Sequence, residues 1–163
     1  MPGCSCKRVD IKHLIPTTYQ RMSKAYISVA LRQQVRREAR FRCGYCLTPE
    51  LYTGQQLVPD HLLPEALGGE TTLDNLWLAC RHCNEHKHQR THAIDPITEA
   101  EVPLFNPRTQ VWALHFVWSD DGTQIHGITA IGRATVAALD MNSEGVVVAR
   151  SFWVQAGWHP PEE

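Results

Sequence analysis

Two Cys-x-x-Cys pairs constrain this chain most strongly, Cys43 with Cys46 and Cys80 with Cys83. Each pair places two thiolates on one side of a tight turn, a spacing that fits one edge of a tetrahedral Zn2+ ion. Two such turns make a closed four-cysteine site, which predicts structural rather than catalytic zinc. Two disulfides or four free thiols are the alternatives, and the matched pairs favour zinc. An ion bound in this way contributes directly to the free energy of folding.

The segment between the two pairs predicts two short strands. Residues 55–64 form an apolar run that proline ends, with Asp60 and His61 at its end. The dipeptide at 68–69 is Gly-Gly, a turn signal. Residues 72–78 predict a turn that leads into a second apolar strand.

A helix is predicted from Cys83 onward, because the composition there becomes helical. Asn84, Lys87 and His88 follow at spacings that place them on one face of such a helix. The predicted order of elements is therefore strand, strand, helix, with polar side chains at the end of the first strand and the start of the helix.

The chain carries C-x-x-C, D-H, G-G, D-N-L, C-x-x-C-N and K in that order between residues 41 and 92. This pattern resembles the HNH endonucleases, the ββα-metal nucleases, in their zinc-knuckle form. Small HNH proteins of bacteria, cyanobacteria among them, are similar. The resemblance implies an α+β protein built around a ββα-metal module that a Cys4 zinc site holds together.

The resemblance also implies a role for each polar residue of the motif. His61 would be the general base that takes a proton from the attacking water. Asp60 and Asn84 would hold a divalent cation, and Asn75 would orient the active-site loop and thus the histidine. Many family members have histidine where this chain has Asn84, which leaves the preferred metal open.

The chemistry of these residue types agrees with those roles. An imidazole, with an ordinary pKa of about 6.5, suits a base that works at neutral pH. A carboxylate and an amide oxygen suit Mg2+ or Mn2+. His88 is a candidate nitrogen ligand, which would shift the preference toward Mn2+, Ni2+ or Zn2+. Lys87 and Arg90 are candidates for contacts with phosphate.

Each of these residues also has a simpler interpretation. Asp60 and His61 could be an ordinary turn pair, Asn75 a turn residue and Asn84 a helix cap. His88 could be a solvated side chain on the helix surface.

Residues 26–41 predict a helix, with Ser28 as its N-cap and a narrow apolar stripe. Its other faces carry arginines: Arg32, Arg36, Arg37 and Arg40. Zinc-knuckle HNH proteins often carry a similar helix before the first cysteine pair, where it steers the module onto the DNA backbone. We therefore expect Arg36 and Arg40 to contact DNA, with a merely solvated face as the alternative.

Three regions are predicted along the chain. Residues 1–24 form an N-terminal arm, in which Cys4 and Cys6 are too closely spaced to clamp zinc well. Residues 25–95 form the module with its preceding helix, and residues 96–163 form an extension packed on it.

The extension predicts a hairpin and two helices. Strands are expected within 111–118 and 123–128, joined by an Asp-Gly turn. Helices are expected over 131–139, capped by Thr129, and over 144–156. Most of the tryptophans lie here and are expected to complete the core rather than to stack on bases: Trp112, Trp118, Trp153 and Trp158.

Composition limits the partners of the chain. A net charge of -1 argues against very tight sequence-independent binding to nucleic acid, although the basic residues crowd into the first part of the chain. No apolar run is long enough to cross a membrane. The first residues, Met-Pro-Gly-Cys-Ser-Cys-Lys, lack an apolar signal core, so we expect a reducing, cytoplasmic location.

The sequence thus predicts a metal-dependent endonuclease that hydrolyses DNA phosphodiesters and leaves 5'-phosphate and 3'-hydroxyl ends. Its expected cofactors are structural Zn2+ and catalytic Mg2+ or Mn2+, with Ni2+ as a further candidate. A zinc-knuckle module that binds nucleic acid without cutting it is the main alternative, and an inactive nuclease fold that serves as a subunit is another. Monomer and homodimer are both open.

Overall fold

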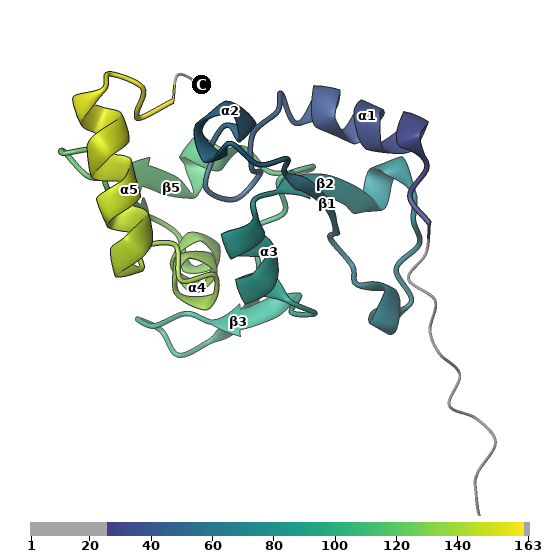
Figure 1. The fold of residues 1–163 in the computed structure, drawn as a ribbon. Helices are drawn as coiled ribbons and strands as arrows, with labels where there is room; N and C mark the ends of the chain where they lie inside the picture. Colours follow the sequence, from purple (N-terminus) through teal and green to yellow (C-terminus); the bar gives the residue numbers. More distant parts are fainter. Residues whose placement is uncertain (1–25, 162–163) are drawn as a thin grey trace, which may run out of the picture.

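The computed structural model describes residues 26–161, so the predicted arm with Cys4 and Cys6 lies outside the described residues. Within 26–161 the chain forms five α-helices and three two-stranded antiparallel sheets, with short 3-10 turns between them (Figure 1). None of the helices in this range is long and apolar enough to cross a membrane.

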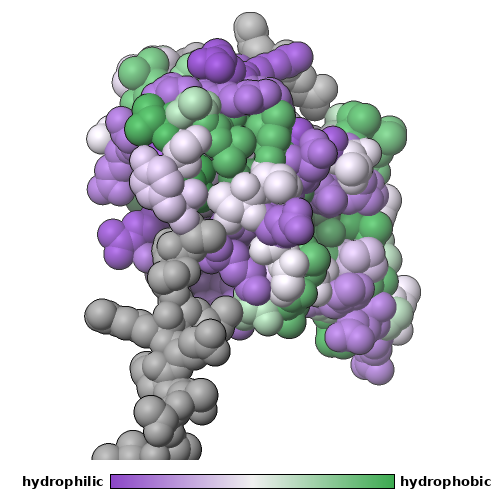
Figure 2. Space-filling view, turned by 90° about the vertical axis from the view of Figure 1, so that its right-hand side faces the viewer, coloured by the Kyte–Doolittle hydropathy of each residue, from purple (hydrophilic) through white to green (hydrophobic). Residues whose placement is uncertain are grey.

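The arginine-rich helix α1 spans Val29–Glu38 and begins at Ser28, whose Oγ accepts a hydrogen bond of 3.2 Å from the backbone N–H of Leu31. Val35 is fully buried on its inner face. The helix ends earlier than predicted, because Arg40 has a left-handed backbone with φ of 50°. Hydrophilic side chains gather along the upper edge of the face in Figure 2, at the height of α1 in Figure 1.

The predicted order of strand, strand and helix is confirmed at the centre of the fold. β1 (Val58–His61) pairs with β2 (Leu76–Ala79), and α3 (Arg81–Lys87) follows directly. Asp60 lies opposite Trp77 and His61 opposite Leu76 in this register. The connection from β1 to β2 contains two 3-10 turns, η2 (Glu65–Leu67) and η3 (Leu73–Asn75), and α2 (Glu50–Thr53) precedes β1.

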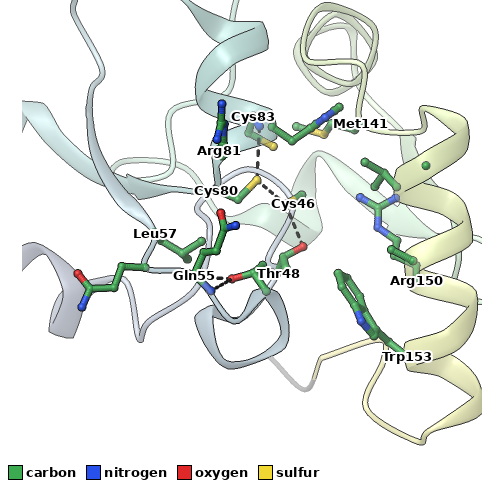
Figure 3. Close-up of a pocket in the computed structure, with 16 residues that line it drawn as sticks. Cys46, Thr48, Gln55, Leu57, Cys80, Arg81, Cys83, Met141, Arg150 and Trp153 are labelled. Carbon is green, nitrogen blue, oxygen red and sulfur yellow. Dashed lines mark hydrogen bonds between the residues drawn. The ribbon is translucent and has the colours of Figure 1, made fainter.

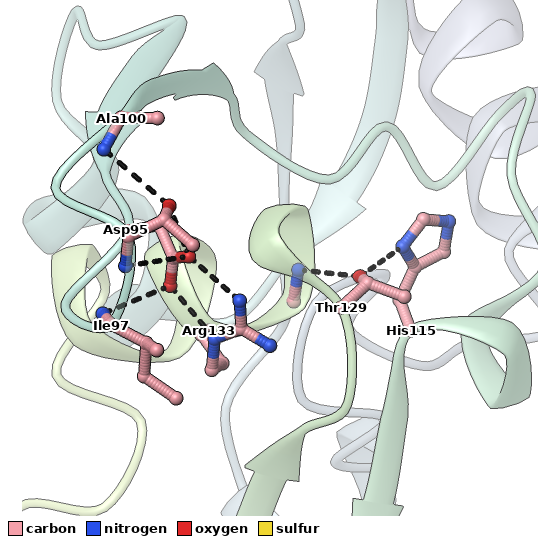
Figure 4. Close-up of polar contacts among 8 residues, drawn as sticks. Asp95, Ile97, Ala100, His115, Thr129 and Arg133 are labelled. Carbon is pink, nitrogen blue, oxygen red and sulfur yellow. Dashed lines mark hydrogen bonds and ion pairs between the residues drawn. The ribbon is translucent and has the colours of Figure 1, made fainter.

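A second hairpin, β3 (His92–Ile94) with β4 (Glu101–Pro103), lies in a segment for which no strand was predicted. Its turn is organised by Asp95, which has no exposed surface. Both carboxylate oxygens accept hydrogen bonds from Arg133 on α4, at 2.8 Å and 2.7 Å (Figure 4). The guanidinium holds the pKa of Asp95 well below its usual range.

The C-terminal third contains the predicted hairpin and both predicted helices. β5 (Phe116–Trp118) pairs with β6 (Ile125–Gly127), and α4 (Ala130–Ala138) and α5 (Glu144–Gln155) follow. The first strand is shorter than expected, because Trp112–Leu114 form the 3-10 turn η4.

One core joins the module to this C-terminal third. It contains buried side chains from α1, the cysteine turns, β2, β5 and the segment after α4: Val35, Tyr45, Leu78, Phe116 and Met141. The indole N–H of Trp112 donates to the backbone carbonyl of Tyr45 at 2.8 Å. Trp112 and Trp118 pack against the core, as expected, whereas Trp158 is 54% exposed and stacks on Tyr52.

We expect Gly132→Ala to lower the free energy of unfolding by about 1–3 kcal/mol, because overpacking forces neighbouring backbone to move. A Cβ at Gly132 would lie 2.1 Å from the carbonyl oxygen of His115, where α4 crosses the hairpin. Gly145→Ala on α5 is the matched control, since its Cβ would meet no heavy atom within 4 Å. Urea unfolding of both variants checks the prediction, and equal stability of the two would contradict it.

Candidate functional site

The four cysteines of the two pairs converge into one buried cluster: Cys43, Cys46, Cys80 and Cys83. Their sulfur atoms all lie within 4.8 Å of one another, and Cys46 and Cys80 are 3.7 Å apart. Ligands around a tetrahedral Zn2+ ion with Zn–S bonds of about 2.3 Å are about 3.8 Å apart. All four are free thiols rather than disulfides, so the donor set and its spacing suggest a zinc site.

Local backbone contacts fix both cysteine turns. Cys80 is the N-cap of α3, and its sulfur accepts a hydrogen bond from the backbone N–H of Cys83 at 3.4 Å. Gly44, inside the first pair, donates its N–H to the carbonyl of Leu78 on β2 at 2.8 Å. A Cβ at Gly44 would lie 2.1 Å from the Trp77 ring, so only glycine allows this close approach.

Arg150 brings a buried positive charge from α5 to the same region. Its side chain is fully buried and lines a cavity of about 210 Å³ together with Cys46, Cys80 and Cys83 (Figure 3). One amino group donates to the carbonyl of Thr123 at 3.0 Å, while Nε and Nη2 have no hydrogen-bond partner within the described residues. Burial lowers the pKa of Arg150, and the cysteines oppose that shift.

Asp60, on β1, is buried and receives two donors. The Tyr45 hydroxyl donates to Oδ2 at 3.0 Å, and Lys87 Nζ on α3 lies 3.2 Å from the same oxygen. Lys87 also donates to the carbonyl of His61 at 2.8 Å. Burial raises the pKa of Asp60, and Lys87 opposes this shift. A carboxylate has about four acceptor positions, so these donors leave room for a cation.

His61 is held by a chain of contacts that the sequence did not reveal. Its Nε2 lies 2.9 Å from Thr71 Oγ1, and the Thr71 hydroxyl donates to Glu65 Oε1 at 3.4 Å. A hydroxyl has one hydrogen, so Thr71 must accept from His61 while it donates to Glu65. His61 then carries its proton on Nε2 and keeps the lone pair on Nδ1.

Asn75 clamps the loop that follows His61. Its Oδ1 accepts from the Leu63 N–H at 2.8 Å, and its Nδ2 donates to the carbonyls of Leu63 and Glu70, each at 2.9 Å. A Cβ at Gly69 would lie 1.8 Å from the Leu63 carbonyl oxygen, so this clamp requires glycine. The side chain therefore ties both ends of the loop to the start of β2.

Asn84 lies on α3, one helical turn before Lys87, and thus on the face that meets β1. Its side chain is half-buried and makes no hydrogen bond to any residue in the described part of the chain. The amide oxygen is therefore free to bind an ion.

Residues 43–90 match the family described as HNH endonuclease. We call this matched part of the chain the HNH domain. Members of this family act on nucleic acids and are generally endonucleases. Searches of curated proteins and of solved structures found no match. The matched residues contain both cysteine pairs, Asp60, His61, Asn75 and Asn84.

Three basic residues of the HNH domain and its preceding helix have surroundings that the sequence analysis did not predict. Lys87 is 2% exposed and directs its ammonium group to Asp60, so it does not face a phosphate. Arg36 forms an ion pair of 2.6 Å with Glu50, and both side chains are largely buried. His88 follows the end of α3 with φ of 52°, which removes it from the helix face of Asn84. Arg40 and Arg90 are exposed.

We expect Asn75→Asp to lower the free energy of unfolding by about 1–3 kcal/mol, because two carbonyls lose their N–H donor while the acceptor Oδ1 is kept. Asp74→Asn, at the exposed neighbouring position, is the matched control and should leave stability unchanged. Chemical unfolding of the two variants provides the comparison. If Asn75→Asp were as stable as the parent chain, Asn75 would not be the clamp of this loop.

Proposed function

We propose that this protein is a metal-dependent endonuclease that hydrolyses DNA phosphodiester bonds. The observation that carries the proposal is the position of His61 beside Asp60 at the end of β1, against the face of α3 that bears Asn84. The products would carry 5'-phosphate and 3'-hydroxyl ends. A module that only binds nucleic acid needs neither a general base nor an oxygen-rich cation site beside that base.

His61 is the proposed general base. The Thr71–Glu65 contacts fix the ring through Nε2, so Nδ1 is the nitrogen that can take a proton from water. The Asn75 clamp holds Leu63 and Glu70, and it supports Glu65, which lies between these residues, and Thr71, which directly follows Glu70. Asn75 is thus a positioning residue that acts through these two partners.

Asp60 and Asn84 are the proposed ligands of the catalytic cation, Mg2+ or Mn2+. When bound, such an ion stabilises negative charge on the scissile phosphate and on the leaving oxygen. The ammonium group of Lys87 compensates the negative charge of Asp60. The site formed by Asp60 and Asn84 therefore has little net negative charge to attract a cation. We therefore expect phosphate oxygens of the substrate to complete the site, with tight ion binding only when DNA is present.

The four cysteines are the proposed zinc ligands, and Arg150 is the proposed charge partner of that centre. Four thiolates around one Zn2+ ion carry a net charge of minus two, which the buried guanidinium from α5 would partly compensate. Arg40 and Arg90 are the proposed contacts with the DNA backbone, because both are exposed and basic.

A nucleic-acid-binding module without cleavage is the second candidate. The observation that favours it is the Lys87–Asp60 ion pair, because an ammonium group already lies against the carboxylate that would hold the catalytic cation.

We expect His61→Ala to lower cleavage of supercoiled plasmid by about 100-fold to 10000-fold in Mg2+, Mn2+ or Ni2+, since it removes the base. His126→Ala, an exposed histidine on β6, should cleave like the parent chain. Loss of cleavage in both variants, or in neither, would contradict the assignment. Binding of the parent chain to the plasmid without cleavage in any metal would favour the second candidate.

We expect Cys80→Ser to lose zinc and to unfold at a lower temperature, because a missing ligand opens the closed site. Arg150→Met, which keeps much of the apolar stem, should keep zinc but release it to a chelator more readily. Cys4→Ser, at a cysteine that belongs to neither Cys-x-x-Cys pair, is the control. Metal analysis and chelator competition provide the measurements, and full zinc content in Cys80→Ser would refute the four-cysteine site.

A further inference from the structure

A second group of metal-ligating side chains consists of His82 and His86 on α3 and Asp140 from the segment after α4. His82 lies between Cys80 and Cys83 in the chain, but no cysteine belongs to this group. One ligand atom from each residue lies within 4.8 Å of the others. The two histidines are one helical turn apart on the same face, and their ring centroids are 4.2 Å apart.

Backbone contacts hold the rings in place. His86 Nδ1 lies 2.9 Å from the carbonyl oxygen of His82, and a carbonyl cannot donate, so Nδ1 carries the hydrogen. The lone pair of a neutral His86 ring is then on Nε2, which lies 3.8 Å from Asp140 Oδ2. His82 Nε2 lies 2.8 Å from the carbonyl oxygen of Asp140, so this nitrogen carries the hydrogen and the lone pair of a neutral His82 ring is on Nδ1.

Asp140 has an unusual backbone conformation. Its φ of 46° is in the left-handed region, which costs an L-residue other than glycine about 1 kcal/mol. In this conformation both its carbonyl oxygen and its carboxylate meet the histidines of α3. The conformation ends α4, because a left-handed residue after the C-cap lets the Met141 N–H donate to the Val136 carbonyl at 3.1 Å.

We propose that His82, His86 and Asp140 form a second transition-metal site, distinct from the four-cysteine cluster and from the Asp60–Asn84 site. Neighbouring ligands around an ion with bonds of about 2.1 Å are roughly 3.0–3.4 Å apart. His86 Nε2 and Asp140 Oδ2 are 3.8 Å apart, and the three ligand atoms lie within 4.8 Å of one another, so an ion would draw them closer together.

The donor set selects the kind of metal. Two imidazole nitrogens and one carboxylate suit Zn2+, Ni2+, Co2+ or Cu2+, whereas Mg2+ prefers oxygen ligands. The side chains of His86 and Asp140 are 39% and 55% exposed, so an ion can enter from solvent and keep water on its open positions.

Such an ion would connect two distant parts of the chain. α3 belongs to the HNH domain, while Asp140 lies between α4 and α5 in the C-terminal third. Binding at this site would therefore fasten the C-terminal third to the domain, and the apparent stability of the chain would rise with the concentration of free Zn2+ or Ni2+.

The test uses the full chain with its cysteine site loaded, titrated with Ni2+ by calorimetry in the absence of DNA. We expect the parent chain to bind one Ni2+ ion, and His86→Ala to bind it at least about tenfold more weakly. Asp140→Asn, which keeps the backbone contacts and the shape, should also weaken it. His126→Ala is the control and should bind Ni2+ as the parent chain does.

Broadening of the His82 and His86 ring resonances by paramagnetic Ni2+ provides a second measurement that needs no variant. Absence of Ni2+ binding by the parent chain would overturn the proposal, as would equal affinity in His86→Ala. Because neither measurement involves cleavage, an inactive protein that binds Ni2+ here would still support this site while refuting the proposed nuclease.

Discussion

The convergence of four cysteines is the constraint on which the rest of the structure depends. One pair lies in the turns after α1, and the other lies between the end of β2 and the first turn of α3. Gly44 ties the first pair to β2, and Arg150 brings α5 to the same place. A zinc ion at this point would therefore hold the domain together and would also fix the angle at which α3 meets β1.

The angle between α3 and β1 determines which side chains meet at the proposed catalytic site. α3 places Lys87 against Asp60, and the same helix face carries Asn84. Burial raises the pKa of Asp60, and the ammonium group of Lys87 opposes this shift. The Lys87–Asp60 ion pair leaves little net negative charge to attract a cation. In the proposed site, a phosphate of the substrate therefore supplies the further charge. His61, in contrast, is oriented by the loop that Asn75 closes.

The sequence predicted those parts of the fold that local signals encode. The Cys-x-x-Cys pairs, Thr129 as a cap and the Asp-Gly turn all led to elements that the structure contains. The hairpin of β3 and β4 was missed because its strands are only three residues long and its turn depends on Arg133, distant in sequence. The burial of Lys87 was not predicted, because an unpaired lysine is almost never buried and the sequence did not reveal that Asp60 is its partner. The contacts of Thr71 and Glu65 with His61 likewise exist only once the loop is closed.

The central claim is that Asp60, Asn84 and a substrate phosphate together bind the catalytic cation beside His61. Anomalous diffraction from crystals of His61→Ala with a DNA duplex and Mn2+ tests this most directly, because the inactive variant should retain uncleaved substrate. We expect Mn2+ to be bonded to oxygens of Asp60, Asn84 and one phosphate, with a separate zinc signal among the four sulfur atoms. DNA bound on another face, or Asp60 paired with Lys87 and no Mn2+ beside it, would contradict the account.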